Sequence, residues 1–172
     1  MRKYQIIENK EGKKAIFDTE TGQQISQWWN HIYKEGLVQG KSAYYEVAFK
    51  NHIHDPWEYA IFHKDNPYEP VSLWWNSIHA NELLDGKSEY YIAYNYNEKQ
   101  AIFHINNPHE SITQWYDYAY PFGLIKGESE CYAVFEKNTH TSYIYHISDT
   151  LQPLYKLSNI PIDSLLYFNY DL

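Results

Sequence analysis

The chain has 172 residues, 44% apolar and 19% aromatic, so it is not disordered and is long enough for one domain with a sizeable core. Its formal net charge of −8 argues against nucleic acid, which needs clustered Lys and Arg, and favours a protein partner with a basic surface. Cys131 is the single cysteine, which excludes an internal disulfide and a cysteine-rich zinc site. No apolar stretch has the length of a secretion signal or a membrane span, so the sequence predicts a cytoplasmic protein with no membrane contact.

Three landmarks recur along the chain with nearly the same spacings. The tripeptide Ala-Ile-Phe starts at residues 15, 60 and 101, which are 45 and 41 residues apart. An aromatic pair starts at residues 28, 74 and 115, and a glycine lies at residues 40, 86 and 127, both with spacings of 46 and 41. Because independent landmarks shift together, the sequence predicts one tandem-repeat domain of about four units with atypical ends, approximately 4–49, 50–94, 95–135 and 136–172. The last unit is a degenerate copy that contains residues 143–146 and 167–170.

Each unit reads as a series of short strands. The first is a tyrosine-rich run, at residues 44–49, 90–94 and 132–135, and residues 4–7 match it before the first copy. The Ala-Ile-Phe run is a second strand, followed by a turn containing Gly or Asn-Pro. A third, shorter strand is expected at residues 24–25, 70–71 and 111–112.

A hydroxyl residue, Ser26, Ser72 or Thr113, then precedes apolar residues at helical spacing, which is typical of a helix N-cap. Gly36, Gly86 and Gly123 are expected to end such helices, and Pro121 limits the third to about two turns. The predicted fold class is therefore mainly β, an antiparallel β repeat protein of units of about 41–46 residues with short helical connectors. The alternative is α+β, with ββα repeats whose helices pack on an antiparallel sheet.

The order Ala-Ile-Phe, turn, Ile/Val-Ser-x-Trp-Trp-Asn and Gly-Lys-Ser-x-Tyr-Tyr resembles the WG-repeat family of bacterial tandem-repeat proteins. The matching segments are 16–45, 61–91 and 102–132, which cover most of the chain. The glycine of the family's Trp-Gly dipeptide is missing, since Lys14-Ala15, Tyr59-Ala60 and Gln100-Ala101 stand in its place. The resemblance implies a β-rich repeat scaffold with no defined catalytic residues.

The segment from Gly36 to Ser42, which contains Gly40-Lys41-Ser42, is similar to a phosphate-binding loop. Its spacing is one residue too short, the second copy lacks the first glycine, and a strand follows where a helix is required. We therefore interpret it as a turn of the repeat.

Four titratable residues, one in each unit, directly follow the second strand. Equivalent positions of a repeat array line up, and three imidazoles with one carboxylate are suitable zinc ligands. A candidate metal site thus contains Asp18, His63, His104 and His146. The alternative is a polar position near a turn that carries His in three units by chance.

The aromatic pairs cannot point both rings to one side of a strand. One ring of each pair is expected in the core, which leaves the other as a candidate contact for a protein or a sugar. These candidate binding residues are Trp28, Trp29, Trp74, Trp75, Trp115 and Tyr116. Cys131 replaces the tyrosine found in the other units and reads as a packing substitution.

No catalytic motif is visible, so we expect no enzymatic activity and no cofactor. The first hypothesis is a non-enzymatic protein-interaction module, such as an immunity or inhibitor-type protein that binds a basic partner. The second is a carbohydrate-binding or other small-ligand module that uses exposed tryptophans. The third is a metal-binding protein that uses the repeated histidines.

Overall fold

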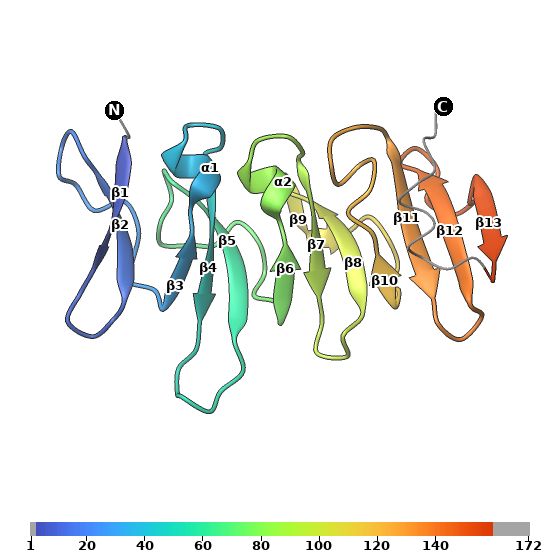
Figure 1. Cartoon of the computed structure of the whole chain (residues 1–172), viewed down its shortest axis with the longest axis horizontal. Coiled ribbons are helices and arrows are strands. Elements are labelled where there is room, and N and C mark those ends of the chain that lie inside the picture. The colour runs from blue at the N-terminus through green and yellow to red at the C-terminus, as the bar shows by residue number, and fades with distance from the viewer. Residues whose placement is uncertain (1–2, 160–172) are drawn as a thin grey trace.

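The computed structural model describes residues 3–159 and places four small antiparallel sheets side by side in an open row (Figure 1). The first strand and the last described strand lie at opposite ends of the row, so these residues form an open array and not a closed ring (Figure 1). The mainly β prediction with short helical connectors is confirmed.

Each sheet is built around one hairpin. In chain order, the sheets contain β1 (Tyr4–Glu8) and β2 (Lys14–Asp18); β3 (His31–Tyr33), β4 (Tyr44–Phe49) and β5 (Glu58–His63); β6 (Ser77–His79), β7 (Tyr90–Tyr94), β8 (Gln100–His104) and β9 (Asn107–Ser111); and β10 (Tyr118–Ala119), β11 (Cys131–Glu136), β12 (Thr141–His146) and β13 (Tyr155–Ser158). Two four-residue helices, α1 (Glu35–Val38) and α2 (Asn81–Leu84), precede β4 and β7. Within the described residues, neither helix is long and apolar enough to cross a membrane.

The aromatic pairs lie where the chain passes from one sheet to the next. Trp29 exchanges two backbone hydrogen bonds with Lys14 of β2, at 2.8 and 2.9 Å, and His31 then starts the strand that pairs with β4. Trp75 with Tyr59 and Tyr116 with Gln100 repeat this arrangement. The expected unit boundaries after residues 49, 94 and 135 therefore fall between strands that pair, whereas the chain changes sheets just after each aromatic pair.

The N-cap prediction is wrong, because the hydroxyl residues belong to the edges of the sheets. The side-chain oxygens of Ser26, Ser72 and Thr113 accept hydrogen bonds from the backbone N–H groups of Ile16, Ile61 and Ile102, at 2.9, 2.9 and 3.1 Å. Each hydroxyl thus takes the place of a backbone carbonyl beside the second strand of its unit, and it satisfies a buried donor. The expected third strand forms in the third copy, as β9, whereas residues 24–25 and 70–71 are not in strands. The helices form after the aromatic pair, and neither has a side-chain cap.

The prediction of helix-ending glycines is only partly correct. Gly36 lies inside α1, and Gly40 and Gly86 follow the two helices with φ of +72° and +71°. Among the described residues, the third copy forms turns here and no helix, and Gly127 has the same φ of +71°. A left-handed residue after a helix favours glycine, so Gly40 and Gly86 end the two helices, and Gly127 ends the turn at the same position of the third copy.

The core lies between neighbouring sheets. Ile61 of β5, for example, packs with Leu83 and Leu84 of α2 and with Tyr91 of β7. Inside each hairpin after the first, two aromatic rings stack across the strands with centroid distances of 5.3–5.8 Å: Tyr45 on Phe62, Tyr91 on Phe103 and Tyr132 on Tyr145. Because the three largest clusters each draw on two sheets, the stability of one unit depends on its neighbours.

The fourth copy keeps the hairpin of the repeat. Residues 143–146 lie in β12, and the backbone N–H of Leu154 donates to the carbonyl of Ile144 at 2.7 Å, as Ile25, Val71 and Ile112 do to β2, β5 and β8. The predicted final strand at residues 167–170 lies outside the described residues.

Candidate binding groove

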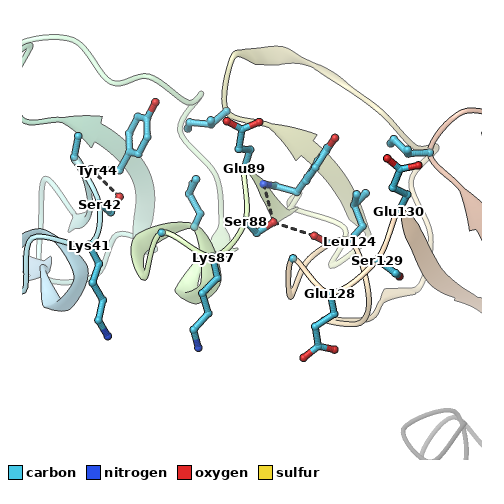
Figure 2. A pocket seen from close by; sticks show the side chains of 17 residues that line it. Lys41, Ser42, Tyr44, Lys87, Ser88, Glu89, Leu124, Glu128, Ser129 and Glu130 are labelled. Atoms are coloured by element: carbon cyan, nitrogen blue, oxygen red, sulfur yellow. Dashed lines mark hydrogen bonds between the residues drawn. The ribbon is translucent and has the colours of Figure 1, made fainter. Parts of the chain in front are cut away.

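A groove of about 640 Å³ crosses the edge of the second, third and fourth sheets, at the ends of the sheets nearest α1 and α2 (Figure 2). Its walls are the equivalent turns at residues 41–44, 86–90 and 127–130. Its apolar part comes from the side chains of Leu83, Ile105, Leu124 and Ile147. One groove is thus assembled from the same element of three consecutive sheets.

Two glycines allow these turns to approach closely. A Cβ atom on Gly86 would lie 2.1 Å from the carbonyl oxygen of Lys41, and one on Gly127 would lie 1.9 Å from the carbonyl oxygen of Lys87. The hydroxyl of Ser88 also donates to the carbonyl of Leu124 at 2.9 Å, which ties the second of these turns to the segment between β10 and β11. These contacts fix the groove through the backbone.

The turns do not form a phosphate site. The backbone N–H groups of Lys41 and Lys87 already donate to the carbonyls of Gly36 and Glu82, at 2.9 and 2.8 Å. A phosphate loop needs such donors to be directed at the ligand. The interpretation of Gly40-Lys41-Ser42 as a repeat turn agrees with this geometry.

Charged side chains form two rows along the groove. Lys41, Lys87 and Glu128 extend in one direction from successive turns, whereas Glu89 and Glu130 extend in the other (Figure 2). The side chains of Glu89 and Glu130 are 68% and 73% exposed. Both remain accessible to a bound partner.

Two of the candidate metal ligands position the groove carboxylates. The Nε2 atoms of His104 and His146 lie 3.1 Å from carboxylate oxygens of Glu89 and Glu130, respectively. Their Nδ1 atoms accept hydrogen bonds from the backbone N–H groups of Asn106 and Ser148. Each imidazole is thus held by the turn that directly follows its own strand and is directed at one acidic side chain.

The other two members of the candidate metal site have separate local roles. The Asp18 carboxylate accepts hydrogen bonds from the N–H groups of Glu20 and Thr21, which lower its pKa. His63 accepts from the N–H of Asp65. Among residues 3–159, no group of three or more His, Cys, Asp or Glu side chains is placed to hold a metal ion, so the four positions do not form the shared site.

The aromatic pairs form a ladder between the sheets. The second members Trp29 and Tyr116 are buried, and Trp75 is half-buried. The first member of each later pair packs on the second member of the preceding pair, with centroid distances of 5.7 Å for Trp74 on Trp29 and 5.6 Å for Trp115 on Trp75. Trp28 packs on Phe17. None of these residues lines the groove, and Trp115, at 37% exposure, is the most accessible tryptophan of the three pairs.

Truncation of the ladder should reduce stability unevenly. We expect Trp74→Ala to lower the free energy of unfolding by about 3 kcal/mol and Trp115→Ala by about 1 kcal/mol. Trp74 contacts the rings of Trp29, Phe49 and Phe62, whereas Trp115 contacts Trp75 and Phe103 and is partly in solvent. Urea unfolding followed by circular dichroism measures both, and equal losses would contradict a ladder that holds Trp74 more tightly.

The groove residues were not predicted as a binding site from the sequence. Lys41, Lys87 and Glu128 occupy one equivalent position, and Ala43, Glu89 and Glu130 another, so the spacings of 46 and 41 residues already contained the signal. The spacing does not predict on which side of the array these positions lie, nor that they line one groove.

The comparisons add no assignment, since neither a protein-family model nor a curated protein matches the chain.

Proposed function

We propose that the chain is a non-enzymatic cytoplasmic protein-interaction module whose groove binds an extended, basic segment of a partner protein, as an immunity or inhibitor-type protein would. The observation that carries the proposal is the construction of the groove from equivalent turns of three consecutive sheets. A surface that repeats along an array suits a ligand that also runs along the array.

The chemistry of the groove supports a peptide partner. Apolar side chains line its interior and charged side chains flank it, which is the usual anatomy of a protein interface. Glu89, Glu128 and Glu130 outnumber Lys41 and Lys87, and the whole chain carries −8. A segment rich in Lys and Arg would be attracted to this surface and would be aligned by Glu89 and Glu130.

The two other hypotheses have less support. Trp74 and Trp115 both pack between sheets, and of the tryptophans in the pairs only Trp115 is exposed, at 37%. His104 and His146 contact different carboxylates, those of Glu89 and Glu130, in separate hairpins. The resemblance to WG repeats remains a proposal that is compatible with a repeat scaffold for binding.

Selection from a displayed peptide library tests the proposal. We expect the chain to enrich peptides with several Lys or Arg residues next to apolar ones. The double variant Glu89→Lys/Glu130→Lys should then bind the selected peptides about tenfold or more weakly, since like charges would replace two favourable ones.

The matched control is Glu20→Lys/Glu69→Lys, which changes the net charge equally at two exposed glutamates outside the groove. This control should lose much less affinity. Enrichment of no peptide, or equal losses in both double variants, would refute the groove as the binding site.

A further inference from the structure

A second, smaller pocket lies at the other end of β7, where the β7–β8 turn meets the fourth sheet. Tyr90, at the start of β7, lines the groove, whereas Tyr94, at its end, lines this pocket. The pocket has a volume of about 330 Å³. It is lined by Asn76, Tyr94, Asn97, Glu98, Gln100, Asp117, Tyr118 and Lys137.

The central feature of the pocket is the amide of Gln100. This residue is only 5% exposed, and its Oε1 accepts a hydrogen bond from the backbone N–H of Ala119 at 2.8 Å. That bond fixes the orientation of the amide. The NH₂ group has no hydrogen-bond partner among residues 3–159, although the side chain lines the pocket. This nitrogen is not one of the fully buried side-chain atoms without a partner, so it is accessible from the pocket and can donate to water or to an acceptor of a ligand.

Of the three copies that contain Ala-Ile-Phe, the third alone has an amide side chain at this position. The equivalent residue before Ala-Ile-Phe is Lys14 in the first copy and Tyr59 in the second. Both exchange backbone hydrogen bonds with a tryptophan, as Gln100 does with Tyr116, so the backbone position does not require glutamine.

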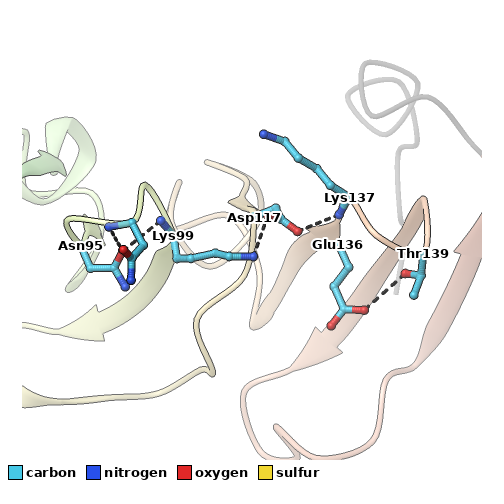
Figure 3. Close-up of polar contacts among 7 residues, drawn as sticks. Asn95, Lys99, Asp117, Glu136, Lys137 and Thr139 are labelled. Atoms are coloured by element: carbon cyan, nitrogen blue, oxygen red, sulfur yellow. Dashed lines mark hydrogen bonds and ion pairs between the residues drawn. The ribbon is translucent and has the colours of Figure 1, made fainter.

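A carboxylate with a fixed geometry lies in the same pocket. Asp117 Oδ1 is 2.7 Å from Lys99 Nζ, and its Oδ2 accepts from the backbone N–H of Lys137 at 2.8 Å (Figure 3). The Lys99 ammonium and the Lys137 N–H lower the pKa of Asp117, so it is an acceptor at neutral pH. Each oxygen keeps a further lone pair for a ligand hydroxyl.

The remaining walls supply an amide and aromatic surface. Asn76 occupies the position of Asp117 in the preceding copy, and its side chain makes no hydrogen bond within residues 3–159. Tyr94 and Tyr118 add two rings, with the ammonium of Lys137 4.9 Å from the centroid of the Tyr118 ring.

We propose that this pocket binds a neutral sugar ring. Sugar hydroxyls both donate and accept, so one ring can accept from the Gln100 NH₂ and donate to Asp117 and Asn76 while its carbon face covers a tyrosine. The pocket lies at the lower end of the range of ligand sites, about 300–1,000 Å³, which suits a monosaccharide unit. Lys137 is balanced by Glu98 and Asp117, which gives no excess of positive charge for an anion. None of the tryptophans lines this site.

Saturation-transfer NMR on the full chain tests the site with glucose, galactose, mannose and N-acetylglucosamine, and with inorganic phosphate followed by phosphorus NMR. We expect at least one sugar to bind at millimolar concentration. Gln100→Glu keeps the acceptor for the Ala119 N–H and removes the donor, so it should weaken sugar binding about tenfold or more.

Tyr118→Leu provides an independent variant, because it removes an aromatic surface from a partly exposed position. It should also weaken binding about tenfold, whereas Gln23→Glu, on the first sheet, should bind like the unchanged chain. If Gln100→Glu does not fold by circular dichroism, Tyr118→Leu decides. Binding of phosphate alone, no binding of any sugar, or unchanged affinity in a folded Gln100→Glu or Tyr118→Leu variant would overturn the proposal.

Discussion

Alanine at Gly86 or Gly127 is expected to cost about 3 kcal/mol or more of stability, whereas alanine at Gly40 should cost only about 1 kcal/mol. The three glycines occupy one position of the repeat and share a φ of +71° or +72°. Each variant therefore carries the same penalty for a left-handed alanine. The difference comes from space, since a Cβ on Gly86 or Gly127 would overlap a carbonyl oxygen of the preceding turn, whereas a Cβ on Gly40 meets no atom within 4 Å.

Urea unfolding of the three variants measures the difference, and Gly40→Ala is the internal control for backbone strain. The overlap is with backbone atoms, so relief requires two sheets to move apart and should also disturb the groove. Binding of the library-selected peptides should accordingly weaken in Gly86→Ala and Gly127→Ala and be retained in Gly40→Ala. Equal stability losses at all three positions would show that the turns do not pack as described.

Much of the fold was predictable because the repeat multiplies weak signals. A single run such as Tyr-Tyr-Ile-Ala-Tyr at residues 90–94 is ambiguous, but three such runs at matched distances predict strands with the same register. The described hairpins have that register, with Tyr45, Tyr91 and Tyr132 opposite Phe62, Phe103 and Tyr145. Local patterns thus sufficed for the strands.

The role of the hydroxyl residues was not predictable from local pattern. Ser72 before apolar residues at helical spacing has the sequence of an N-cap, yet its oxygen accepts from Ile61, eleven residues earlier. The competing interaction is a long-range β contact, which overrides local helix propensity.

The groove likewise depends on a contact between residues that are far apart in the sequence. The sequence aligns Lys41 with Lys87 and Glu128, but only the contact of Gly86 with the Lys41 backbone places these turns against each other. The same limit applied to the histidines, since equivalent positions line up along an array without coming close enough to share a metal.

The free energy of unfolding should fall as the pH rises from about 5 to about 8, because of the carboxyl group of Glu46. This glutamate is 6% exposed and lies opposite Tyr33 and Ile61 in neighbouring strands. No hydrogen bond or ion pair involves its carboxyl group within the described residues. Because Ile61 packs against α2 and β7, the carboxyl side of β4 faces the apolar contact between the second and third sheets. The equivalent residues of the other hairpins are the apolar Ile92 and Ala133.

Burial raises the pKa of Glu46 to about 8, from 4.5 for an ordinary glutamate. The folded state therefore holds a proton that the unfolded state releases above about pH 4.5. Stability is fully present below that value and is lost as the pH rises towards 8, where the folded carboxyl ionises. The expected loss between pH 5 and pH 8 is on the order of 3 kcal/mol. Asp117 acts in the opposite direction, because its lowered pKa removes stability only in acid.

Urea unfolding of the unchanged chain and of Glu46→Gln, across this pH range, isolates the effect. The glutamine cannot ionise, so the difference between the two stability curves should grow with pH in favour of the variant. Glu46→Ile, which copies the residue at position 92, should be more stable than the unchanged chain at pH 8. Glu110→Gln, at an exposed glutamate, is the control and should follow the unchanged chain. Parallel curves for Glu46→Gln and the unchanged chain would mean that the Glu46 carboxyl reaches water in the folded protein.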